Sequence, residues 1–253
     1  MLELEADGPV AHLTLSRPEK LNALSPQLLE ELIEAAGVLD GIREVKVVVL
    51  AGAGRAFCAG FDLDAFVSGG GRDLRDTADL GRRMAEALTG MRPLTIAAIH
   101  GPCVGGGVVL ASACDLRLAA VDAIFSIPEV DLGIPLAWGG VPRLVRELGP
   151  AVTRELVLTC RPFDAEEARA LRFLNRVVAA GEHIAAADAL AGQLAEKPGV
   201  VLRATKQRVN AVLEDIATTA GSETDADLLL AAVADPESQE HAQRYLARRG
   251  RRS

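Results

Sequence analysis

Residues 99–110 place the strongest constraint on what this chain can fold into. A strand-like apolar run at 94–98 precedes three consecutive glycines at 105–107, and a short apolar segment expected to be helical follows them. Glycines let backbone or ligand approach closely. If the helix begins at the glycines, its first N–H groups lack helical partners and form a site for an anion or a developing oxyanion. Close packing of the helix on a sheet also requires glycines, and on the triplet alone packing is the favoured interpretation.

The composition predicts a globular protein with a large core. The chain has 253 residues, which fits one domain with an appendage, and 49% of them are hydrophobic. The net charge of −8 argues against a nucleic-acid partner. The acidic start lacks the features of a signal peptide, and no apolar run is long enough to span a bilayer, so we expect no membrane partner.

The four cysteines give no sign of a disulfide framework or a metal site. They lie far apart in the sequence, with no Cys-x-x-Cys pair and no histidine at ligand spacing. We therefore expect reduced, mostly buried thiols in a cytoplasmic protein, and no metal.

The N-terminal half alternates strand and helix patterns. Residues 2–6 and 10–15 predict a hairpin that turns at Asp7-Gly8, and Ser25 followed by Pro26 predicts the start of a helix. Further strands are expected at 45–50, 115–120 and 123–127, and a helix is expected to end before Pro93. This alternation predicts an α/β fold with parallel strands. Residues 67–72, with three glycines, are interpreted as a mobile loop and a possible lid hinge.

The C-terminal half is mostly helical. Helices are expected at 141–148, 152–158, 165–171 (capped by Asp164) and 182–196, with a short strand at 175–178. Pro198-Gly199 marks a boundary, and amphipathic helices follow near 200–216, 223–233 and 238–249. We divide the chain into a core, 1–197, and a helical region, 198–253, whose apolar face must be buried on the core or on another subunit.

Taken together and in order, five motifs resemble the crotonase superfamily, the enoyl-CoA hydratase/isomerase family. They cover nearly the whole chain: Ser16-Arg17-Pro18-Glu19-Lys20-Leu21-Asn22-Ala23-Leu24, Phe57-Cys58-Ala59-Gly60-Phe61-Asp62-Leu63, Gly105-Gly106-Gly107, Ile127-Pro128-Glu129-Val130-Asp131-Leu132-Gly133 and Trp138-Gly139-Gly140-Val141-Pro142-Arg143-Leu144. The end of the chain, from Tyr245, is divergent.

The resemblance implies a crotonase-like spiral of strand–strand–helix turns, with a C-terminal helical trimerisation region and trimers often paired into hexamers. It implies a CoA thioester as substrate and no other cofactor. The thioester oxygen is expected in an oxyanion hole formed by the N–H groups of Phe61 and Gly106. With the family in view, the oxyanion interpretation of the glycines leads over packing.

The expected reaction depends on one substitution. Typical hydratases of the family use two glutamates, and this chain has the second as Glu129 but has Val109 at the position of the first. Addition of water needs two proton-transfer groups, whereas a double-bond shift needs one base. We therefore expect an isomerase that uses Glu129. The alternative for Glu129 is a structural role. The alternatives for the protein are a hydratase or related lyase acting on an unusual CoA ester, and an acyl-CoA carrier without catalysis.

The remaining site residues follow from the same resemblance. Val109, Leu136 and Trp138 are expected to line the acyl pocket, although Trp138 serves equally well as core. CoA-binding residues are expected to be Lys20, Leu21, Ala59 and Arg248, and for Arg248 a basic tail is the alternative. Asp131 shares the face of Glu129 if the segment is a strand, but a solvated or capping role is favoured.

Overall fold

The chain begins with the expected hairpin and capped helix. The computed structural model describes residues 1–62 and 74–250, with side chains for 1–62 and 75–247. Strands β1 (Leu2–Asp7) and β2 (Val10–Leu15) pair antiparallel, with Asp7 opposite Val10. The Ser25 hydroxyl accepts a hydrogen bond from Leu28 N at 3.2 Å and caps α1 (Pro26–Gly41).

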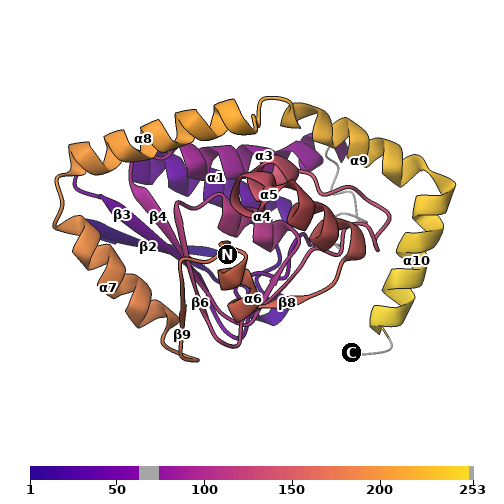
Figure 1. Cartoon of the computed structure of the whole chain (residues 1–253), viewed down its shortest axis with the longest axis horizontal. Helices are drawn as coiled ribbons and strands as arrows, with labels where there is room; N and C mark the ends of the chain where they lie inside the picture. The colour runs from indigo at the N-terminus through magenta and orange to yellow at the C-terminus, as the bar shows by residue number, and fades with distance from the viewer. Residues whose placement is uncertain (63–73, 251–253) are drawn as a thin grey trace.

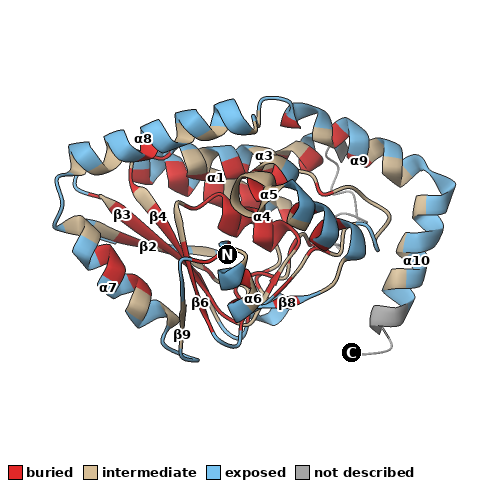
Figure 2. Cartoon of the chain, in the orientation of Figure 1, coloured by how far each residue is buried: buried red, intermediate tan, exposed pale blue. Residues whose placement is uncertain are grey.

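The main sheet has six strands and is parallel beyond the first hairpin. Its order is β1-β2-β3-β4-β6-β9, where β3 is Val47–Gly52, β4 Leu94–Ile99, β6 Leu116–Ala120 and β9 Arg176–Val178. Alternate residues of β3 pack on opposite faces, Val48 with α1 and Val49 with α7 (His183–Ala195). Helices cover both faces, which explains the continuous apolar run of this strand (Figures 1 and 2).

A second, smaller sheet was absent from the sequence-based prediction. It contains β5 (Pro102–Val104), β7 (Ile124–Ser126) and β8 (Phe163–Asp164). The expected strand at 123–127 is therefore present as β7, but β5 and β8 have three and two residues. Such short strands carry too little periodicity to be recognised in a sequence.

The two sheets and the helices form the expected spiral. One turn consists of β4, β5 and α4 (Gly106–Ser112), and the next consists of β6, β7 and α5 (Gly140–Thr159). In the turn before them, β3 is followed by an extended segment bridged through Cys58 to Cys103, and then by α3 (Leu74–Gly90). The two helices expected at 141–148 and 152–158 are both present within α5, separated at Gly149, whose φ of 75° and ψ of 164° are not helical.

The C-terminal helices wrap around the core. After α6 (Ala165–Ala170) and α7, α8 (Gly199–Ile216) runs along one side of the molecule, and α9 (Asp225–Ala234) and α10 (Pro236–Gly250) continue around it (Figure 1). Short 3₁₀ turns occur at Pro18–Lys20 and Ser222–Thr224. Among the helices described, none has the length and apolar composition required to cross a membrane.

Candidate functional site

Residues 58–62 lie between two segments that are distant in the sequence. On one side, Leu24 N donates to Gly60 O at 2.8 Å and Asp62 N donates to Leu24 O at 3.1 Å. On the other side, Val104 N donates to Cys58 O at 2.9 Å. These bonds bring Phe61 to the glycine triplet. Gly60 has a φ of +91°, and a Cβ there would lie 2.8 Å from Val104 O and 3.6 Å from Gly106 N, so the close approach requires glycine.

The glycine triplet begins a fully buried helix. Gly105 N donates to Ser126 O at 2.9 Å, and Gly106 is the first residue of α4. The N–H of a first helical residue has no acceptor within its own helix. Because a Cβ on Gly60 would lie only 3.6 Å from Gly106 N, the backbone next to Phe61 and the start of α4 lie close together. The oxyanion-hole prediction requires this proximity.

Glu129 is a buried carboxylate that lies against the glycine triplet. A Cβ built on Gly105 would overlap Oε1 of Glu129, so the side chain occupies the space that this glycine leaves open. The other oxygen, Oε2, is buried and has no hydrogen-bond partner among the described residues. Burial raises the pKa of Glu129 to about 7, against a small lowering by its own backbone N–H.

Asp131 does not share the face of Glu129. The segment is a turn rather than a strand, with Leu132 N donating to Pro128 O at 3.1 Å and Ile134 N donating to Glu129 O at 3.0 Å. Asp131 is exposed, and it is absent from the causes of the raised pKa of Glu129. The strand hypothesis was wrong, and the favoured solvated position of Asp131 agrees with the structure.

A cavity of about 60 Å³ joins Glu129 to the predicted acyl pocket. Its walls include all three predicted pocket residues and both predicted oxyanion residues: Phe61, Ala78, Gly106, Val109, Glu129, Ile134, Pro135, Leu136, Ala137, Trp138 and Leu229. Sequence reasoning missed Ala78 on α3 and Leu229 on α9, because their helical periodicity only identifies an apolar face and not what that face covers.

Trp138 fills the space beside both predicted oxyanion residues. Its ring meets the ring of Phe61 edge-on, with centroids 5.6 Å apart, and a Cβ on either Gly106 or Gly81 would overlap the indole. The backbone of Trp138 has a φ of 65°, in the left-handed region that aromatic residues seldom occupy. Trp138 is thus both core and pocket wall, and its conformation is unusual.

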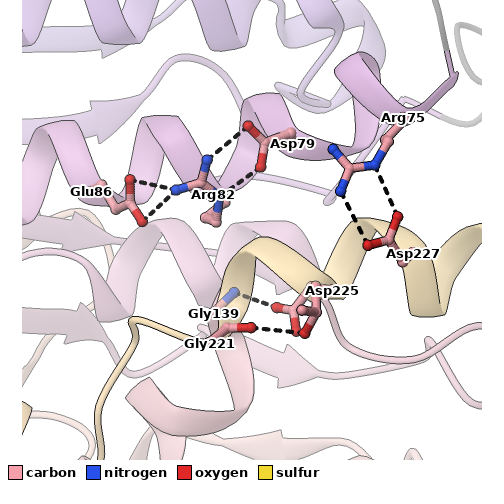
Figure 3. A network of polar contacts seen from close by, with 9 residues as sticks. Arg75, Asp79, Arg82, Glu86, Gly139, Gly221, Asp225 and Asp227 are labelled. Atoms are coloured by element: carbon pink, nitrogen blue, oxygen red, sulfur yellow. Dashed lines mark hydrogen bonds and ion pairs between the residues drawn. The ribbon is translucent and has the colours of Figure 1, made fainter.

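Helix α9 is tied to this turn by polar contacts (Figure 3). Asp225 accepts a hydrogen bond from the backbone N–H of Gly139, the residue after Trp138, at 2.8 Å. Nearby, Arg75 of α3 pairs with Asp227 of α9 through bonds of 2.9 and 3.1 Å. The C-terminal helical region therefore holds the loop that carries Trp138.

The predicted CoA-binding residues are partly brought together. Ala59 N donates to Leu21 O at 2.9 Å, so these two residues are neighbours, and Lys20 is exposed beside them at the end of a 3₁₀ turn. Arg248 falls within α10, but its side chain lies outside the described part of the structure. The glycine-rich loop interpreted as a lid hinge also lies outside the described residues.

The histidine before the glycines is a core residue. His100 Nε2 contacts Gly54 O at 2.9 Å, and its ring stacks on His183 at 4.3 Å. Within residues 1–62 and 74–250, no three His, Cys, Asp or Glu side chains gather as a metal site. Three of the four cysteines are buried, and burial raises the pKa of Cys58 to about 12.

Comparisons with known proteins give consistent matches. A family model described as enoyl-CoA hydratase/isomerase matches residues 5–252. The chain is 34% identical over 225 residues to a short-chain-enoyl-CoA hydratase of Clostridium acetobutylicum, covering 88% of this chain and 86% of that protein. It is 40% identical over 189 residues to a peroxisomal Delta(3,5)-Delta(2,4)-dienoyl-CoA isomerase of Arabidopsis thaliana, covering 70% and 68%. A solved enoyl-CoA hydratase/isomerase from Xanthobacter autotrophicus has a TM-score of 0.88 at 28% identity, covering 100% and 98%.

Proposed function

The chain belongs to the enoyl-CoA hydratase/isomerase family, and from this premise we propose that it shifts a double bond within a CoA thioester, using Glu129 as its single acid–base residue. The observation that carries the proposal is the composition of the pocket. One buried carboxylate, Glu129, faces the glycine triplet, while Val109 fills the position where a hydratase needs a second carboxylate.

The oxyanion hole supplies the electrostatic part of the mechanism. The thioester oxygen accepts hydrogen bonds from the N–H groups of Phe61 and Gly106 and gains negative charge when an α-proton leaves. A fixed donor aimed at such an oxygen stabilises the transition state by about 3 kcal/mol. Because both donors belong to the backbone, the aromatic side chain of Phe61 is compatible with the role.

Glu129 carries the proton. Its carboxylate removes a proton from the α-carbon, and the enolate is then protonated at the γ-carbon by the same group, which moves the double bond and leaves the enzyme unchanged. A pKa of about 7 suits this task, since both protonation states are populated near neutral pH. The absence of a described hydrogen-bond partner at Oε2 is consistent with an oxygen that serves substrate.

The remaining expectations complete the proposal. Lys20, Leu21, Ala59 and Arg248 bind the CoA moiety, and no cofactor or metal takes part beyond that thioester. The protein works as a homotrimer or as paired trimers, without nucleic-acid or membrane partners. Its cysteines, all of them free thiols, fit a reducing cytoplasm.

The experiment that tests the proposal is α-proton exchange. Butyryl-CoA is incubated with the protein in heavy water, and deuterium at the α-carbon is followed by mass spectrometry. We expect exchange with the native protein and a loss of at least about 100-fold in Glu129→Gln, with Glu34→Gln, an exposed glutamate of α1, as the matched control. Exchange that persists in Glu129→Gln contradicts the role of Glu129, and thioester binding without exchange in the native protein favours a carrier.

Hydration is the second candidate function, because several relatives are named hydratases. Val109 is buried in the wall that also holds Glu129, so Val109→Glu introduces the missing carboxylate into the same pocket. We expect the native protein to hydrate crotonyl-CoA poorly and the variant to do so at least about tenfold faster, with Val109→Gln as the uncharged control. Efficient hydration by the native protein would refute the isomerase assignment.

A further inference from the structure

A cavity of about 570 Å³ lies beneath α8, separate from the acyl pocket. It reaches the carboxyl end of α4 at Ser112 and the first turns of α5 at Arg143. Helix α4 has seven residues and is about 10 Å long, so its amino end at Gly106 borders the acyl pocket and its carboxyl end borders this second cavity. The volume is typical of small-molecule sites.

Part of the wall is aliphatic. Six leucine and valine side chains from the sheet, α7 and α8 contribute to it: Leu94, Leu116, Leu194, Leu202, Val209 and Leu213. A ligand of this cavity therefore has an apolar body, because these side chains offer no hydrogen bonds.

The polar part of the wall is positively charged. Five of its residues are basic and two, Asp115 and Glu147, are acidic. Both carboxylates are already paired, Asp115 with Lys206 at 2.8 Å and Glu147 with Arg117 at 2.6 Å. Arg146 is paired with Glu214, which lies outside the wall, at 2.5 Å. Arg143 and Arg172 are then the wall cations without an ion pair among the described residues.

Arg143 is a buried cation of this wall that forms no ion pair with the described residues. It is only 4% exposed, its Nη1 donates to Thr89 Oγ1 at 2.7 Å, and its Nε is buried with no acceptor in the part of the chain that the structure describes. No ion pair to Arg143 is found among those residues. Burial lowers its pKa to about 10, with a further lowering by Arg146 that attraction from Glu86 and Glu214 opposes. A buried cation in this condition is destabilising until an anion arrives.

We propose that the cavity beneath α8 binds an organic carboxylate with an aliphatic body. The carboxylate pairs with Arg143 and the hydrocarbon part lies along the leucines. A guanidinium and a carboxylate form a charge-assisted pair that is strongest where water is excluded. The proposal is independent of the reaction proposed for the acyl pocket.

Octanoate is the probe for this site. Isothermal titration of the full-length protein with sodium octanoate is expected to show one site per chain, with at least about tenfold weaker binding in Arg143→Met. Methionine fills similar space without leaving a buried charge, and Thr89 Oγ1 keeps its bond to Ala113 O. Arg154→Met, exposed on the same helix and outside the cavity wall, is the matched control and is expected to bind like the native protein.

A second pair of variants tests the proposal even if Arg143→Met does not fold. Thr205 is exposed on α8 and contributes to the wall, so Thr205→Glu adds a negative charge that repels octanoate, whereas Thr205→Gln adds similar bulk without charge. We expect weaker binding only in Thr205→Glu.

Several results would overturn the proposal. These are failure of octanoate to bind the native protein, equal binding by both Thr205 variants, and equal binding by Arg143→Met where it folds. Binding of inorganic phosphate or octylamine in place of octanoate would contradict the ligand class. Octanoate binding seen only in protein diluted below its assembly concentration would assign the cavity to a subunit interface and also refute it.

Discussion

Glu129 is a carboxylate that the fold buries, and no cation from the described residues is among the causes of its pKa shift. Its pKa rises from 4.5 to about 7 because burial penalises the charged form. Between these two values the folded chain holds a proton that the unfolded chain has released. Folding stability from this residue is therefore greatest below pH 4.5 and falls as the pH rises to about 7, above which the full penalty is present.

Removing the charge should therefore stabilise the protein at high pH. We expect Glu129→Gln to raise the free energy of unfolding by about 3 kcal/mol near pH 8 and by close to zero near pH 4, because each pKa unit corresponds to about 1.4 kcal/mol. Urea unfolding at both pH values measures this difference, with Glu34→Gln as the exposed control. A gain of equal size at both pH values would contradict the burial argument.

At the level of single residues, motifs predicted which residues lie around the cavity. They left open the local backbone conformation, which decides the direction of a side chain such as that of Asp131. Glu129, Phe61, Gly106 and Val109 could be assigned because their motifs are contiguous, and the structure gathers all four around one cavity. For Asp131 the favoured solvated position agrees with the structure. The alternative, in which it shares the face of Glu129, requires a strand, and the turn that begins at Glu129 removes that premise.

At the level of elements, the predicted acyl pocket lies where α3, α9 and the turn before α5 meet. Trp138 fills the space above Gly81 of α3, and Leu229 of α9 closes the wall. The periodicity of α3 and α9 could be read from the sequence, but their contact could not, because it joins residues about 150 positions apart along the chain, as Arg75 and Asp227 show. The small volume of the pocket follows from this contact.

Trp138 should set the length of the acyl group. We expect Trp138→Gly and Trp138→Ala to raise kcat/KM for octenoyl-CoA relative to butenoyl-CoA by at least about tenfold, because both remove the ring that fills the cavity. The glycine variant should be the more stable by about 1 kcal/mol, because glycine adopts the positive φ at this position without a steric cost and alanine does not.

The comparison between these two variants separates pocket volume from backbone strain. Thermal unfolding measures the stability difference, and steady-state rates on the two thioesters measure the chain-length preference. An unchanged preference in both variants would show that Trp138 is core alone.

At the scale of the whole molecule, the outer face of α8 is apolar and exposed. Four of its side chains are between 43% and 67% accessible: Val200, Val201, Val212 and Ile216. The inner face of the same helix packs on the core, with Lys206 buried and bonded to Pro93 O at 2.9 Å. Exposed apolar side chains grouped on one helix are typical of a protein–protein interface. This agrees with the expectation from the sequence that the C-terminal helices can be buried on another subunit.

We expect these four side chains to hold copies of the chain together. Light scattering should give about 80 kDa for a trimer, three times the 26.5 kDa of one chain, or about twice that for paired trimers. Val212→Glu combined with Ile216→Glu should lower the mass to that of one chain, whereas Val121→Glu, at an exposed position elsewhere, should not. An unchanged mass in the double variant would place the interface on another surface.

Because Leu229 and Asp225 belong to the last quarter of the chain, the pocket is completed late in synthesis. The ribosome releases β3, the glycine turn and Glu129 long before α9, so a nascent chain holds both proposed backbone donors and the proposed base while Leu229 is still missing from the pocket wall. A chain that ends before Leu229 lacks one wall residue of the cavity that also holds Glu129. The complete wall around Glu129 is thus present only in a chain that includes α9.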